Sequence, residues 1–147
     1  MVLCDLLIRL ALAGYYRPLW SREILDETAR SVLRRRPDLG IELLQRRVDA
    51  MQRVFPDAMV TGYDERLAQL SALGKDAHVL AAAVQGGADL VVTHNVRDFP
   101  AALLGQYQIV ADARPVSRGS LAAQPRRRRE HRGRAICRHT HAALEAP

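Results

Sequence analysis

Cysteine is scarce in this chain, and it has no long uninterrupted apolar run and no internal repeat. Its two cysteines, Cys4 and Cys137, lie near opposite ends. Two distant cysteines make no disulfide framework, which is typical of proteins from a reducing compartment. The apolar residues 1–14 are interrupted by Asp5 and Arg9, are too short for a membrane span and lack the basic start of a signal peptide. We therefore expect a cytoplasmic protein that does not enter a membrane.

The net charge of +6 belongs to one end of the chain. Residues 1–111 carry 12 Arg and one Lys against 13 acidic residues and are neutral. Residues 112–147 carry 9 Arg against 3 acidic residues, which accounts for the whole excess. The second segment is rich in Arg, Pro, Ser and Gly and has too few apolar residues to bury, so we predict disorder there from Arg114 onward. The predicted organisation is a folded domain at 1–111 and an Arg-rich tail at 112–147.

Two groups in the tail are candidate binding residues. The run of arginines at 126–129 could contact nucleic-acid phosphates, although a run of like charges is more often solvated. Cys137, His139 and His141 alternate along the chain, but no second cluster completes the four ligands of a structural metal site.

Helical and extended segments alternate along the first 111 residues. Apolar periodicity and breaking residues predict helices at residues 3–14, 22–36, 41–55, 65–73, 76–85 and 101–107. Extended segments are predicted at residues 15–20, 58–60, 90–93 and 108–111. Ser21 and Asp64 are the expected N-caps of the second and fourth helices. This alternation is typical of an α/β fold with a parallel sheet covered on both faces. A nucleotide-type phosphate site is disfavoured, because no Gly-rich loop follows a strand.

The stretch from Lys75 to Pro100 forms the central unit of this prediction. Asp76 opens its helix, Gly86 and Gly87 end it, and a β-branched strand follows. A ten-residue helix and a strand of four to five residues each span roughly 15 Å, so a tight turn aligns their ends. We therefore expect Asp76, Asn95 and Asp98 at one edge of the sheet. Carboxylates and an amide on such a rim are suitable ligands for a hard divalent cation.

Each acidic candidate also has a purely structural explanation. Asp76 is a favoured N-cap residue that could bond an amide in the first turn of its helix. Asp98 could cap the next helix, since Pro100 belongs in a first helical turn. Glu27 could form an exposed ion pair with Arg30, three residues on. The spacing of the residues alone does not separate these explanations from metal binding.

Two motifs carry a family resemblance. The patterns D-x-x-V-L-A-A-A from Asp76 and G-A-D-x-V-V-T-x-N-x-x-D-F-P from Gly87 strongly resemble the C-terminal motif block of PIN-domain nucleases. This is the fold of the VapC-type toxins of bacterial toxin-antitoxin pairs. An acidic residue in the pattern S-x-E-I-L-x-E faces the metal site in that family, and Glu27 matches it. The resemblance implies a three-layer α/β/α domain with a small parallel sheet and the activity of a metal-dependent endoribonuclease.

The same resemblance implies roles for individual residues. Glu27, Asp76 and Asp98 would be catalytic ligands of Mg²⁺ or Mn²⁺. Thr93 and Asn95 would orient ligands or water, and Asn95 stands where many relatives carry a stronger Asp ligand. The bound ions would lower the pKa of a water molecule and stabilise charge on the phosphate. RNA is the implied substrate and an antitoxin-like protein the implied partner; a homodimer is left open.

One part of the PIN pattern has no match in this chain. A PIN domain begins with a strand that ends in the first catalytic Asp, whereas Asp5 here belongs to a predicted helix. The absent strand lies in the middle of the family's sheet, so buried backbone groups of both neighbours would lose partners, at about 1 to 3 kcal/mol each. Either the chain is an incomplete enzyme with weakened activity, or it is an inactive PIN-like module that binds RNA or an antitoxin-like protein.

Overall fold

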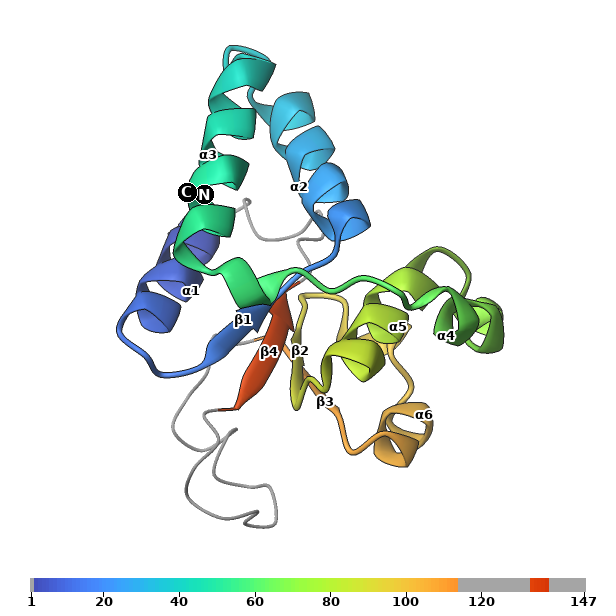
Figure 1. Ribbon diagram of the computed structural model, residues 1–147. Coiled ribbons are helices and arrows are strands. Elements are labelled where there is room, and N and C mark those ends of the chain that lie inside the picture. The colour runs from blue at the N-terminus through green and yellow to red at the C-terminus, as the bar shows by residue number, and fades with distance from the viewer. Residues whose placement is uncertain (1, 114–132, 138–147) are drawn as a thin grey trace.

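The computed structural model describes residues 2–113 and 133–137 as helices and strands in alternation (Figure 1). The α-helices are α1 (Val2–Leu12), α2 (Arg22–Arg35), α3 (Ile41–Val54), α4 (Asp64–Gln69), α5 (Ala77–Gly86) and α6 (Ala101–Gln106). The strands are β1 (Arg17–Leu19), β2 (Leu90–Val92), β3 (Val110–Asp112) and β4 (Arg134–Cys137). Three 3-10 turns accompany them: η1 (Pro56–Ala58), η2 (Ser71–Asp76) and η3 (Val96–Asp98). Within the described ranges, none of the helices has the length and apolar character needed to cross a membrane.

The strands form one parallel sheet in the order β1-β4-β2-β3. Successive side chains of a strand point to opposite faces, and the core divides accordingly. Val91 and Ile136 pack in a cluster with the alanine-rich face of α5. Leu90, Val92 and Ala135 pack in a second cluster with residues of α1. Helices therefore cover both faces of a small parallel sheet, which confirms the predicted three-layer α/β/α architecture.

The strand β4 overturns part of the prediction for the C-terminal segment. Arg134–Cys137 were expected in a disordered tail, but they form a strand between β1 and β2 and pair with both. The amide of Arg17 donates to Gly133 O at 2.9 Å, and the amide of Asp89 donates to Arg134 O at 2.8 Å. The expected loss of backbone partners in the middle of the sheet was therefore wrong. The rest of the tail, including Arg126–Arg129, His139 and His141, lies outside the described residues.

Two further local predictions were wrong. The strand expected at residues 58–60 is replaced by the turn η1 and an isolated parallel bridge between Trp20 and Met59. Asp64 is the first residue of α4 rather than its cap, because Tyr63 occupies the N-cap position. By contrast, Ser21 caps α2 as predicted, since its Oγ accepts a hydrogen bond from the Ile24 amide at 3.3 Å.

The end of α5 packs tightly against the sheet through Gly86. A Cβ at Gly86 would lie 2.9 Å from both Leu19 Cδ1 and Val60 Cγ2, two side chains of the core. Gly87 then ends the helix in the left-handed conformation, with φ of 63°. The pair of glycines thus combines a close helix-to-sheet contact with a helix stop, of which the sequence predicted only the stop.

We expect Gly86→Ala to lower the free energy of unfolding by about 1 to 2 kcal/mol, because the added methyl must displace buried side chains. Gly105→Ala in α6 is the matched control, since a Cβ at Gly105 meets nothing within 4 Å. At position 105, alanine should raise the free energy of unfolding by about 0.5 to 1 kcal/mol, because it has a higher helix propensity than glycine. Urea unfolding of both variants measures the difference, and equal stabilisation by the two alanines would contradict a tight contact at Gly86.

Candidate active site

Asp76 lies at the start of α5, at the end of the helix that faces the carboxyl end of β2. Asp76 is only 3% exposed, and its side chain makes no capping hydrogen bond to α5. Asp76 therefore occupies the N-cap position, but the predicted side-chain bond to an amide of the first turn was wrong. The 3-10 turn η2 carries the chain into this position through Gly74, which has a φ of 60°. A carboxylate is thus held inside the fold at the positive end of a helix, where negative charge is favoured.

Glu27 meets α5 one half-turn beyond Asp76. Its Oε2 lies 3.4 Å from Nε2 of His78, which forms an ion pair when the imidazole is protonated on both nitrogens. The Nδ1 of His78 lies 2.8 Å from the carbonyl oxygen of Lys75, and because a carbonyl only accepts, Nδ1 carries the hydrogen. His78 therefore links α2 to the first turn of α5. The partner of Glu27 is His78 instead of the predicted Arg30, whose Nε donates to Asp26 O.

His78 is the residue of this region that was not predicted as functional. It is a polar residue in a helix whose neighbours Ala77, Val79 and Leu80 are all buried apolar residues. That contrast was visible in the sequence, but a single histidine on an apolar helix does not reveal which other helix it meets. The contact with Glu27 depends on how α2 packs against α5.

Thr93, Asn95 and Asp98 follow the carboxyl end of β2. Thr93 is 1% exposed, and its Oγ1 accepts a hydrogen bond from the Asn95 amide at 3.1 Å. Its own amide donates to Asp112 O at 2.9 Å, which anchors the loop to β3. Asp98 is half-buried at the end of η3 and does not cap α6, whose N-cap position is Pro100. Thr93 thus fixes the loop backbone, and Asn95 is exposed beside it.

Tyr63 lies beside the N-terminal turn of α2. Its hydroxyl donates to Glu23 Oε2 at 3.4 Å. Partial burial raises the pKa of the Tyr63 phenol above its ordinary value, and the nearby Glu23 carboxylate acts in the same direction. Tyr63 is therefore a neutral hydrogen-bond donor at physiological pH.

The acidic candidates do not form a complete metal centre by themselves. Within residues 2–113 and 133–137, no three Asp, Glu, His or Cys side chains gather in a group that could hold a metal ion. The topology places Asp76 and the loop after β2 at one end of the sheet, and the His78 contact brings Glu27 to the same helix turn. A Mg²⁺ ion is often held by only one or two carboxylates together with waters and substrate phosphates. The donor set suits that mode of binding and does not suit a cage made by the protein alone.

Comparison with known proteins places this arrangement in a family. A family model described as PIN domain matches residues 3–97, which include α5, β2 and the residues from Glu27 to Asn95. A relative, the putative ribonuclease VapC50 of Mycobacterium tuberculosis (strain ATCC 25618 / H37Rv), is 44% identical over 54 residues. That match covers 37% of this chain and 32% of the relative, so the chain spans about a third of that protein's length. No solved structure matches the chain. The family model covers well over half of the sequence, and the chain belongs to the PIN-domain family.

Proposed function

We propose that this protein is a metal-dependent endoribonuclease of the PIN type that acts as the toxin of a toxin-antitoxin pair. Single-stranded RNA is the proposed substrate, an antitoxin protein the proposed partner and the cytoplasm the proposed site of action. Membership of the PIN-domain family and the likeness to a protein named as a VapC ribonuclease support this proposal. The observation that carries it within the fold is the burial of the Asp76 carboxylate at the start of α5.

In this proposal Asp76, Asp98 and Glu27 would hold Mg²⁺ or Mn²⁺ beside the RNA phosphate. A bound divalent ion supplies an activated water and stabilises the negative charge of the phosphate during hydrolysis. Asp76 would provide a buried carboxyl group at the start of α5. Thr93 holds the Asn95 backbone in place through the backbone amide of Asn95. The side-chain amide of Asn95 can then orient water or a ligand. When His78 is protonated on both nitrogens, it would hold Glu27 against α5 and limit the rotamers of that carboxylate.

The proposal predicts RNA cleavage that requires a divalent ion. We expect the full chain to cut a single-stranded RNA in Mg²⁺ or Mn²⁺ and to leave it intact with excess EDTA. Calorimetric titration with Mn²⁺ in the absence of RNA gives a second readout, in which we expect weak binding because few carboxylates take part. Cleavage that continues undiminished in EDTA would exclude the proposed mechanism.

The alternative is an inactive PIN-like module that binds RNA or an antitoxin-like protein. One observation favours this alternative: within the described part of the chain, the acidic groups do not assemble into a three-ligand site. The test of this alternative measures RNA binding and cleavage together. An inactive module would bind RNA without cutting it, and would lose that binding when the four arginines at 126–129 are replaced by glutamine. Deletion of the whole C-terminal segment is unsuitable for this test, because it would also remove β4 from the middle of the sheet.

A further inference from the structure

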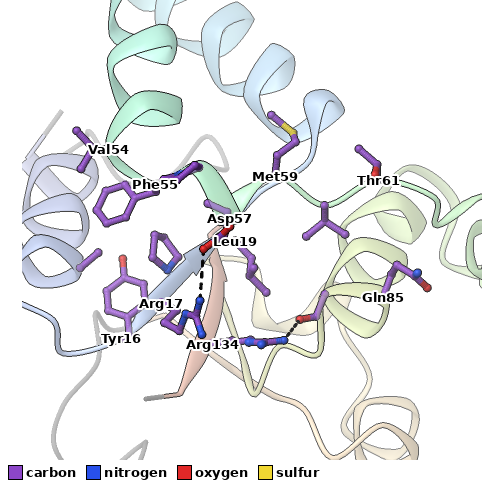
Figure 2. A pocket seen from close by; sticks show the side chains of 16 residues that line it. Tyr16, Arg17, Leu19, Val54, Phe55, Asp57, Met59, Thr61, Gln85 and Arg134 are labelled. Carbon is purple, nitrogen blue, oxygen red and sulfur yellow. Dashed lines mark hydrogen bonds and ion pairs between the residues drawn. The ribbon is translucent and has the colours of Figure 1, made fainter. Parts of the chain in front are cut away.

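A cavity lies at the amino ends of the strands, at the opposite end of α5 from Asp76. It has a volume of about 670 Å³ and is lined by residues of β1, β4, η1 and the last turn of α5. Because α5 has ten residues, this end of the helix is roughly 15 Å from the end that begins after Asp76. The cavity is therefore separate from the candidate active site. Figure 2 shows its lining, with Arg17 and Arg134 together at one side.

The two arginines of the cavity are neighbours across the sheet. Arg17 of β1 and Arg134 of β4 are directly paired residues of parallel strands, so their side chains leave the same face of the sheet. That face is the one covered by α5, since Leu19 and Ile136, two residues further along the same strands, lie in the α5 cluster. Both residues line the cavity, so an anion in it would meet two positively charged side chains.

The contacts of these two arginines leave hydrogen-bonding capacity for a ligand. Arg17 meets Asp57 at 3.8 Å, a long ion pair in which the Asp57 side chain is 85% exposed. Arg134 donates through one nitrogen to Gly86 O at 2.9 Å, and both contacts are drawn in Figure 2. A guanidinium has five N–H donors, and among the described residues each side chain here uses only a small part of them. The weak Asp57 pair is one that a stronger anion could displace.

We propose that this cavity binds a phosphate group through Arg17 and Arg134. A phosphate presents several acceptor oxygens, which suits two planar guanidinium groups approaching from neighbouring strands. The Gly86 contact orients the Arg134 side chain, and Asp57 acts as an internal competitor for Arg17. The phosphate is carried either by a free small molecule or by the backbone of an RNA strand. This site stands apart from the proposed hydrolysis, because it requires neither the acidic residues nor a metal ion.

Titration of the full chain with inorganic phosphate in EDTA tests this site. We expect Arg17→Gln to weaken phosphate binding about tenfold, the effect of one lost charge-assisted contact. Asp57→Asn is expected to strengthen binding by several-fold, because it removes the competing carboxylate. Arg22→Gln is the matched control, since Arg22 is similarly exposed but pairs with Asp26 on α2. We expect that control to bind like the unaltered protein.

Single-stranded RNA in the same EDTA buffer distinguishes the two sources of phosphate. If Arg17→Gln weakens RNA binding and inorganic phosphate displaces the bound RNA, the site holds the RNA backbone. If Arg17→Gln weakens only the binding of inorganic phosphate, the site holds a small molecule. The proposal is overturned if the unaltered chain binds no phosphate, or if Arg17→Gln and Arg22→Gln bind it equally. The opposite responses of Arg17→Gln and Asp57→Asn also separate a lost ligand contact from a loss of folding.

Discussion

Asp76→Asn is expected to reduce RNA cleavage by at least about a hundredfold, the effect of removing one group that stabilises charge at a reacting centre. The substitution keeps the size of the buried side chain while it removes the negative charge and replaces one oxygen by an NH2 group, so the first turn of α5 should keep its packing. An amide also binds a divalent ion more weakly than a carboxylate does. The measurement is the initial rate of cleavage of a single-stranded RNA in Mg²⁺ or Mn²⁺.

Asp64→Asn is the matched control for this variant. Asp64 is an exposed carboxylate in the first turn of α4, so it shares the residue type and lies near a helix start but is not buried. We expect its cleavage rate to stay within about twofold, since a surface substitution outside the site has little effect. Thermal unfolding of both variants checks that the fold is kept. Cleavage by Asp76→Asn at the rate of the unaltered chain would remove Asp76 from the mechanism.

Ile136→Asp is expected to lower the free energy of unfolding by about 4 kcal/mol or more, because it buries a charge without a partner. Ile136 is 0% exposed and is paired with Leu19 on one side and Val91 on the other. With a total stability of about 5 to 15 kcal/mol for a typical domain, this is a large share of the stability. Thermal unfolding followed by circular dichroism should show a midpoint lower by roughly 15 °C.

Val110→Asp provides the comparison for Ile136→Asp. Val110 lies on the edge strand β3 and is 46% exposed, so the same new charge remains in contact with water. We expect a loss of about 1 kcal/mol or less there. Similar unfolding midpoints for the two variants would show that β4 does not occupy the middle of the sheet.

Local sequence patterns were sufficient for most of the individual elements. The apolar periodicity of α2, with Ser21 before it, predicted both the helix and its capping bond. The β-branched run before Thr93 predicted a buried strand, and residues 108–111 predicted a short edge strand. These features depend on residues that are close in sequence, so their physical causes are visible without the fold. The motif around Asp76 also identified the family that the comparison confirmed.

The candidate site was only partly predictable. The position of Asp76 at the start of α5 and the positions of Thr93 and Asp98 after β2 follow from one helix-turn-strand unit, whereas the burial of Asp76 was not predicted. The partner of Glu27 did not follow, because His78 and Glu27 are 51 positions apart and meet only through the packing of α2 on α5. Whether Glu27, Asp76 and Asp98 act on one metal ion stays a prediction.

The sequence by itself determined the helices and the family, because periodicity, capping and motif residues act over short distances along the chain. Only the tertiary structure decided the place of β4. Its residues, Arg134–Cys137, lie in a segment whose average composition predicts disorder. Two buried apolar residues, Ala135 and Ile136, are enough to fill the position between two strands, where the backbone of β4 pairs on both sides. A strand held by long-range pairing on both sides leaves little signal in its own four residues.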